Sequence, residues 1–167
     1  MNNETPVQKR NQLAAQTIIK ALERRQMNGY YATSKEEALH IALSLIPEGC
    51  TVGWGGSATT ETIGLNDALR QGNYRAINRD LAKTQNERMD LMRECFTADC
   101  FVMSTNAISE DGQLVNIDGI GNRVAALVFG PKKVIVVTGM NKVARTLDDA
   151  IARCRTVASP INAQRFK

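Results

Sequence analysis

Apolar residues recur with helical spacing in some segments of the chain and form short uninterrupted runs in others. Helical spacing and capping patterns predict helices at 5–28, from 34 to 46, from 58 to about 69, from 84 to about 96, from 123 to 129 and after Thr146. Short apolar or β-branched runs predict strands that begin at Thr51 and cover 74–77, 98–104 and 134–138. The segments therefore alternate between the two types.

This alternation is typical of an α/β fold with an open, mostly parallel sheet and helices on both faces. The run 134–138 has no polar alternation, which suits a parallel strand covered on both sides. Residues 105–118 predict a β-hairpin whose turn is Glu110-Asp111-Gly112. The 167 residues fit a single domain, 1–167, with helix 5–28 at its periphery.

The segment between the first strand and the next helix is the first candidate site. It holds three glycines (Gly53, Gly55 and Gly56) and three hydroxyl residues (Ser57, Thr59 and Thr60). Glycines let the backbone approach a ligand closely, and the start of a helix favours an anion. We therefore expect these six residues to bind an anionic ligand. A glycine turn that serves only the fold is the alternative.

A second glycine-rich loop, Asp118-Gly119-Ile120-Gly121-Asn122-Arg123, also leads from a strand region into a helix. Ligands of open α/β sheets bind at the carboxyl ends of the strands, so we expect this loop to lie at the same edge as the first. Arg123 begins a helix, where the dipole disfavours a cation. It either pairs with Asp118 or binds a ligand anion together with Asn122; the sequence leaves both open.

Other chemistries are poorly supported. Gly53-x-Gly55-x-x-Ala58 matches the letters of the dinucleotide fingerprint but lacks the acidic residue after the next strand. The single histidine, His40, lies opposite an apolar helix face, which argues against a Ser-His-Asp site. The four cysteines have no C-x-x-C spacing, so we expect buried free thiols and no metal site.

Charge and hydropathy limit the classes of partner and the cellular location that we expect. A net charge of +4 with scattered Lys and Arg argues against nucleic-acid binding. The apolar runs are too short for a membrane span, and the N-terminus lacks the apolar segment of a signal peptide. We therefore expect a cytoplasmic protein, and a homo-oligomer is compatible with this interpretation.

Two segments together resemble a known family. Gly53-Trp54-Gly55-Gly56-Ser57-Ala58-Thr59-Thr60 resembles the first glycine loop of the lactate-utilisation (LUD) domain family. The segment from Met103 to Val124, which contains Asn106, is similar to its second and most characteristic motif, and 129–135 and 139–142 also fit. The likeness extends from about residue 8 to the C-terminus.

This resemblance implies a fold like that of ribose-5-phosphate isomerase, glucosamine-6-phosphate deaminase and the coenzyme A transferases, whose first loop binds phosphates or coenzyme A. It also implies a role in lactate (2-hydroxy acid) utilisation beside iron–sulfur protein subunits. Asn106, within the second motif, joins Asn122 and Arg123 as a candidate ligand-binding residue. Short relatives continue into a cysteine-rich tail, so the chain ending at Lys167 is expected to be incomplete.

Three functions remain open at this point. The first is the binding of an anionic small molecule in lactate metabolism. The second is a phosphosugar isomerase or coenzyme A transferase, for which Glu110 and Asp118 are the candidate catalytic carboxylates. The third is a non-catalytic structural subunit of an oxidoreductase complex. The sequence identifies no cofactor, and it does not decide whether the domain is an enzyme.

Overall fold

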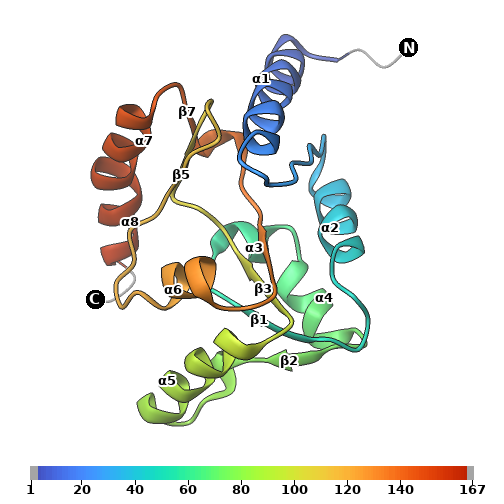
Figure 1. The fold of residues 1–167 in the computed structure, drawn as a ribbon, viewed down its shortest axis with the longest axis vertical. Helices are drawn as coiled ribbons and strands as arrows, with labels where there is room; N and C mark the ends of the chain where they lie inside the picture. Colours follow the sequence, from blue (N-terminus) through green and yellow to red (C-terminus); the bar gives the residue numbers. More distant parts are fainter. Residues whose placement is uncertain (1–3, 165–167) are drawn as a thin grey trace. The chain divides into compact units, whose positions relative to one another are not determined.

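The computed structural model describes residues 4–164 (Figure 1). Its helices are α1 (Pro6–Glu23), α2 (Lys35–Ser44), α3 (Ala58–Thr62), α4 (Leu65–Gln71), α5 (Gln85–Glu94), α6 (Asn122–Phe129), α7 (Leu147–Arg153) and α8 (Ser159–Ala163). Its strands are β1 (Thr51–Trp54), β2 (Arg75–Ile77), β3 (Cys100–Met103), β4 (Ala107–Ser109), β5 (Leu114–Val115), β6 (Lys133–Val136) and β7 (Val143–Ala144). Short 3₁₀ turns cover Arg79–Leu81, Cys95–Thr97 and Met140–Lys142, and a π-helical segment, Cys154–Ala158, joins α7 to α8.

The described chain divides into two compact units, each built from separate segments. The first unit contains 4–37, 105–117 and 138–164, and the second contains 38–104 and 118–137. The second unit holds a four-stranded sheet in the order β2-β1-β3-β6, and every neighbouring pair is parallel. The predicted α/β class with a mostly parallel sheet is therefore confirmed.

Helices cover both faces of this sheet (Figure 1). On one face, α2 and α4 pack against β1 and β3 through a core that includes Val52, Trp54, Leu65 and Val102. On the other face, α5 and α6 pack around Phe101 and Met103. The edge strand β6 contributes Ile135 to the first core and partly buried neighbours to the second, so the prediction of a parallel strand with both faces covered is confirmed.

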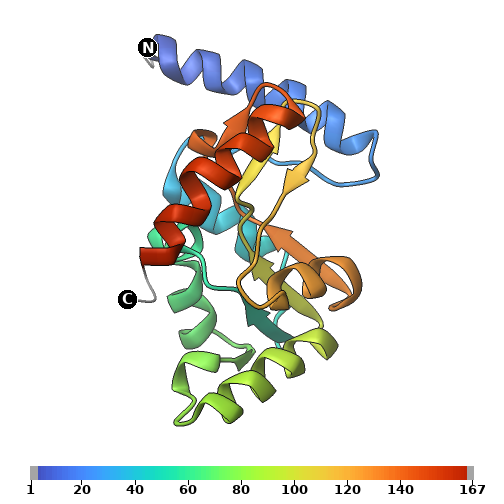
Figure 2. The same cartoon turned by 90° about the vertical axis from the view of Figure 1, so that its left-hand side faces the viewer.

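The first unit contains the predicted β-hairpin. Strands β4 and β5 pair antiparallel, visible as two yellow arrows in Figure 2, and β7 extends β4 on its other side in parallel. The turn is closed by Gly112, whose φ of +75° favours glycine and whose N–H donates to the Ser109 carbonyl at 2.9 Å. A small core of Ala107, Ala150 and Cys154 lies beneath.

Several boundaries differ from the prediction for local reasons. The first helix begins at Pro6 after a Thr5 capping box, but it ends at Glu23 rather than at 28, and Gln26 has a left-handed φ of 60°. The helix expected from 58 to 69 is interrupted at Gly64, whose φ of +76° cannot continue an α-helix, so it forms α3 and α4. The starts of α2 and α5 agree with the prediction, and there Glu37 and Glu87 accept a hydrogen bond from the N–H of the residue before the N-cap.

Candidate functional site

The carboxyl edge of the four-stranded sheet is where the predicted site residues of the second unit gather. From β1 the chain passes to β2 on one side and then crosses to β3 on the other, so the order β2-β1-β3-β6 reverses direction between β1 and β3. In open α/β sheets, ligands bind beyond the carboxyl ends of the strands at such a switch point. The loop after β1, residues 55–57, begins at this point. Its position therefore suits a binding site.

Three successive amides of this loop have no intramolecular acceptor. The N–H groups of Gly56, Ser57 and Ala58 donate to no residue within 4–164, whereas the Gly55 N–H donates to the Val102 carbonyl at 2.9 Å. Gly56 and Ala58 are exposed. Backbone N–H groups without a protein acceptor are available to donate to a bound oxyanion. The loop thus offers an open set of donors.

The hydroxyl groups of the loop are largely used by the fold. The Ser57 Oγ accepts from the Thr60 N–H at 3.2 Å and caps α3, and the buried Thr60 Oγ1 donates to the Ser57 carbonyl at 3.0 Å. Thr59 lies at the switch point, where its Oγ1 accepts from Ser104 Oγ at 3.5 Å. Ser57 and Thr60 thus hold the loop in shape, while Thr59 is half-buried beside β3.

The structure explains the presence of glycine differently at each of the three positions of this segment. Gly53 lies inside β1, and a Cβ there would collide with the Cys95 sulfur, so packing alone accounts for it. At Gly55 a Cβ would sit 3.4 Å from the aliphatic stem of Arg123. At Gly56 it would sit 2.8 Å from Nη2 of Arg79. Two arginines therefore border the loop, Arg123 beside Gly55 and Arg79 beside Gly56.

Arg123 is fully engaged by the protein. Its Nε donates to Asp118 Oδ1 at 2.8 Å, its Nη2 lies 2.6 Å from the same oxygen, and its Nη1 donates to the Ser104 carbonyl at 2.6 Å. Asp118 also accepts from the Val124 N–H at 2.8 Å, which ties it to the first turn of α6. The second glycine loop therefore reaches the first one through Arg123. Asn122 is the first residue of α6, directly after Gly121.

The remaining predicted residues belong to the first unit. The Asn106 side chain accepts from the Ile117 N–H at 3.1 Å, and its carbonyl accepts from Arg153. Glu110 lies in the hairpin turn, where its N–H donates to the Ala144 carbonyl at 2.9 Å. Both residues help to shape the hairpin that contains them.

Sequence reasoning missed Arg79. It lies two residues after β2, whose last pairing with β1 joins Ile77 to Gly53. Arg79 is only 9% exposed, although the sequence 78–80 resembles an ordinary polar loop. The observation that could have identified it is its place after the strand that follows the glycine loop, since consecutive parallel strands are usually neighbours.

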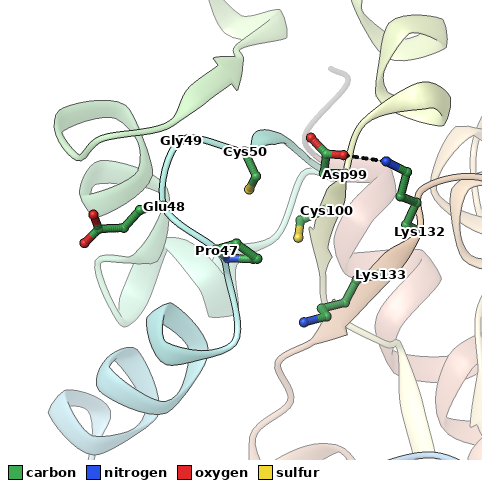
Figure 3. A pocket seen from close by; sticks show the side chains of 8 residues that line it. All are labelled: Pro47, Glu48, Gly49, Cys50, Asp99, Cys100, Lys132 and Lys133. Carbon is green, nitrogen blue, oxygen red and sulfur yellow. Dashed lines mark hydrogen bonds and ion pairs between the residues drawn. The ribbon is translucent and has the colours of Figure 1, made fainter.

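A shallow, open hollow lies at the opposite edge, among the amino ends of β1, β3 and β6 (Figure 3). It encloses about 430 Å³ and is lined by Pro47, Glu48, Gly49, Cys50, Asp99, Cys100, Lys132 and Lys133. Burial, with the adjacent Cys50, raises the pKa of Cys100 to about 11, so the thiol is protonated at neutral pH. The hollow contains none of the predicted site residues.

Within residues 4–164, no three His, Cys, Asp or Glu side chains gather in a way that could hold a metal ion. The four cysteines are free and buried, as expected. No helix between residues 4 and 164 is long and apolar enough to cross a bilayer.

The comparison with known families decides the chain's relationship. The sequence profile of the LUD domain matches residues 15–167. The chain belongs to the LUD domain family. Among solved structures, this LUD domain is similar to ribose 5-phosphate isomerase A from Neisseria gonorrhoeae, with 14% identity and a TM-score of 0.42 over 70% of this chain and 57% of the isomerase chain. No curated protein sequence matches it.

Proposed function

We propose that this LUD domain binds the anionic group of a small molecule at the carboxyl edge of its parallel sheet, in support of lactate (2-hydroxy acid) utilisation. The metabolic part rests on the family, which is associated with lactate utilisation. The binding part rests on one observation: at the switch point of the sheet, the amides of Gly56, Ser57 and Ala58 have no acceptor within residues 4–164. Unpaired amides at such a position are well suited to an oxyanion.

A carboxylate or a phosphate fits this set of donors better than a neutral ligand. An amide N–H bonds more strongly to an ionised acceptor than to a neutral one. The loop is also held by contacts of its own, through Ser57, Thr60 and the Gly55 N–H, so little further ordering is needed when a ligand binds.

The test is Gly56→Val, because a side chain at this position crowds the approach to the three amides. The matched control is Gly119→Val, since a Cβ at Gly119 meets nothing within 4 Å. Thermal shift with sodium L-lactate, sodium pyruvate, sodium phosphate, glucose 6-phosphate and coenzyme A, each against sodium chloride of equal ionic strength, measures binding. We expect one or more anions to raise the Tm of the wild type and of Gly119→Val, but not of Gly56→Val.

Two results would contradict the proposal. One is a wild-type protein whose Tm none of these anions raises beyond the sodium chloride control. The other is a Gly56→Val protein that is folded by circular dichroism and binds the active anion as tightly as the wild type.

A further inference from the structure

Arg79 occupies an unusual position for an arginine. It opens the 3₁₀ turn that follows β2, next to β1 in the sheet, and it is 9% exposed. The turn is fixed by the Asn78 side chain, which accepts from the Asp80 N–H at 3.0 Å. Arginine is almost never buried to this extent unless it is paired.

The Arg79 guanidinium donates no hydrogen bond to any residue in the described range 4–164. The nearest carboxylate oxygen, Asp80 Oδ1, lies 4.0 Å from its Nε, too far for a hydrogen bond. Asp80 is also shared with two other arginines: Arg88 lies at 3.3 Å and Arg70 at 3.7 Å. Asp80 therefore leaves the five donors of Arg79 unused.

The charge around Arg79 makes its isolation more costly. Burial, and then the neighbouring positive charge of Arg88, lower the pKa of Arg79. The neighbouring Asp80, and after it Cys95 and the exposed Glu61, oppose this lowering of the pKa without reversing it. A buried cation without a hydrogen-bonded partner is strongly unfavourable. A negatively charged group that binds beside Arg79 would therefore stabilise the folded protein.

The guanidinium and the unpaired amides border the same loop residue. Nη2 of Arg79 lies 2.8 Å from the position that a Cβ on Gly56 would occupy, so only glycine allows this approach without a shift of the arginine. The Gly56 N–H begins the series of three amides with no intramolecular acceptor. A bound anion at this loop therefore lies within reach of a fork of guanidinium donors as well as of the backbone.

We propose that Arg79 is the charged residue that binds the ligand's anionic group, together with the amides of Gly56, Ser57 and Ala58. The group is an oxyanion with at least two acceptor oxygens, a carboxylate or a phosphate, because a guanidinium fork binds two oxygens at once. The inference rests on the proposed function, since it concerns the same loop. It assigns the counter-charge to Arg79 rather than to Arg123, whose donors already bind Asp118 and Ser104.

The alternative is that Arg79 only fills space beneath the loop. The two possibilities differ in the ligand-free protein. A binding arginine without a partner destabilises the fold, so Arg79→Gln should leave the Tm unchanged or raise it. A space-filling arginine should lower the Tm when it is shortened. Arg75→Gln is the matched control, because Arg75 lies on β2 with 73% of its side chain exposed and carries the same charge.

The experiment measures the Tm without anion and the apparent Kd for sodium L-lactate and sodium phosphate, at constant ionic strength, in the wild type and the variants. We expect Arg75→Gln to behave as the wild type and Arg79→Gln to weaken binding at least tenfold, or about 1.4 kcal/mol. Arg79→Lys, which keeps the charge but loses the fork, should fall between them. A response to lactate alone identifies a carboxylate ligand, and a response to phosphate alone identifies a phosphate.

An independent measurement follows anion binding in the wild type and uses a variant only to assign the signal. The Nε–H resonance of Arg79 in ¹H–¹⁵N spectra, assigned as the signal that Arg79→Lys lacks, should move on titration with the active anion and not with sodium chloride. A resonance that stays fixed while the anion binds would overturn the inference, as would an Arg79→Gln protein with wild-type affinity or a clearly lowered ligand-free Tm.

The two proposals fail in distinguishable ways. If Gly56→Val abolishes anion binding while Arg79→Gln retains it, the loop site stands and Arg79 is not its counter-charge. If no anion stabilises the wild type, the loop site and the role of Arg79 are both wrong.

Discussion

Two arginines border the glycine loop after β1, and they differ in how their donors are used. Arg123 donates to Asp118 and to the Ser104 carbonyl, whereas Arg79 donates to none of the described residues. The sequence pointed to Arg123, because a cation at the start of a helix is conspicuous. For Arg79 the sequence offers only its position after the next strand, because the importance of that residue arises from its burial and from the absence of an acceptor within residues 4–164. Neither of these two properties can be read from the amino-acid sequence alone.

Replacing Arg123 by lysine tests what the engaged arginine does. The side chains of Arg123 and Asp118 are only 12% and 9% exposed, so lysine would leave at least one of the buried acceptors without its donor. We expect Arg123→Lys to lower the free energy of unfolding in urea by about 1–3 kcal/mol. Arg93→Lys, which alters an exposed pair with Asp90, should change it little. Unchanged stability combined with tenfold weaker anion binding would instead place Arg123 in direct contact with the ligand.

At the level of elements, the sequence predicted the strands and the N-caps of the helices well, because both depend on local chemistry. Thr84 and Thr146 cap helices as expected, and the hairpin turn lies at Glu110–Gly112. Helix ends were less predictable: Gly64 interrupts a helix whose apolar spacing continues across it. The strand β7 has only two residues and depends on its pairing with β4, so no local pattern marks it.

Asp99 links the amino ends of β1, β3 and β6. The interactions of its carboxylate predict how the stability of the protein depends on pH. Its carboxylate accepts from the Thr51 hydroxyl at 2.6 Å and the Thr51 N–H at 3.0 Å, and it pairs with Lys132 at 2.9 Å (Figure 3). These hydrogen bonds, and then the ion pair, hold the pKa of Asp99 well below its ordinary value of 3.8. A lowered pKa contributes stability above the ordinary value and loses it as the pH falls below.

We therefore expect Asp99→Asn to be less stable than the wild type at pH 6 to 7, and this difference to shrink as the pH is lowered below about 4. Urea unfolding across this pH range measures the effect. Asp90→Asn is the control, because Asp90 forms only an exposed pair with Arg93. An Asp99→Asn curve parallel to the wild-type curve at every pH would contradict this role of the carboxylate.

On the scale of the whole molecule, the sequence predicted one domain, and the profile of the family spans both units of the described chain. The division into two units could not be predicted because each unit is assembled from separate segments, with the chain passing between them near 37, 104, 117 and 137. Composition does not change at these positions, so no linker is visible. The candidate residues Asn106 and Glu110 consequently belong to a different unit from the glycine loop.

The two units have separate cores, which predicts which elements a core substitution destabilises. Ala150 on α7 is fully buried with Ala107 and Cys154, and none of these residues belongs to the cores around the four-stranded sheet. Ala150→Asp places a carboxylate in this small apolar core, at a cost of several kcal/mol. We expect hydrogen exchange to become faster in β4, β5 and α7, while the amides of β1 and β3 keep their protection.

Ala152→Asp is the matched control, since Ala152 lies on the same helix and is exposed. It introduces the same charge without burying it, and the exchange rates of both units should stay at wild-type values. If Ala150→Asp instead accelerates exchange equally in β1, β3 and β4, the chain unfolds as one cooperative body. The ligand loop in the second unit would then depend for its stability on the hairpin and α7 of the first.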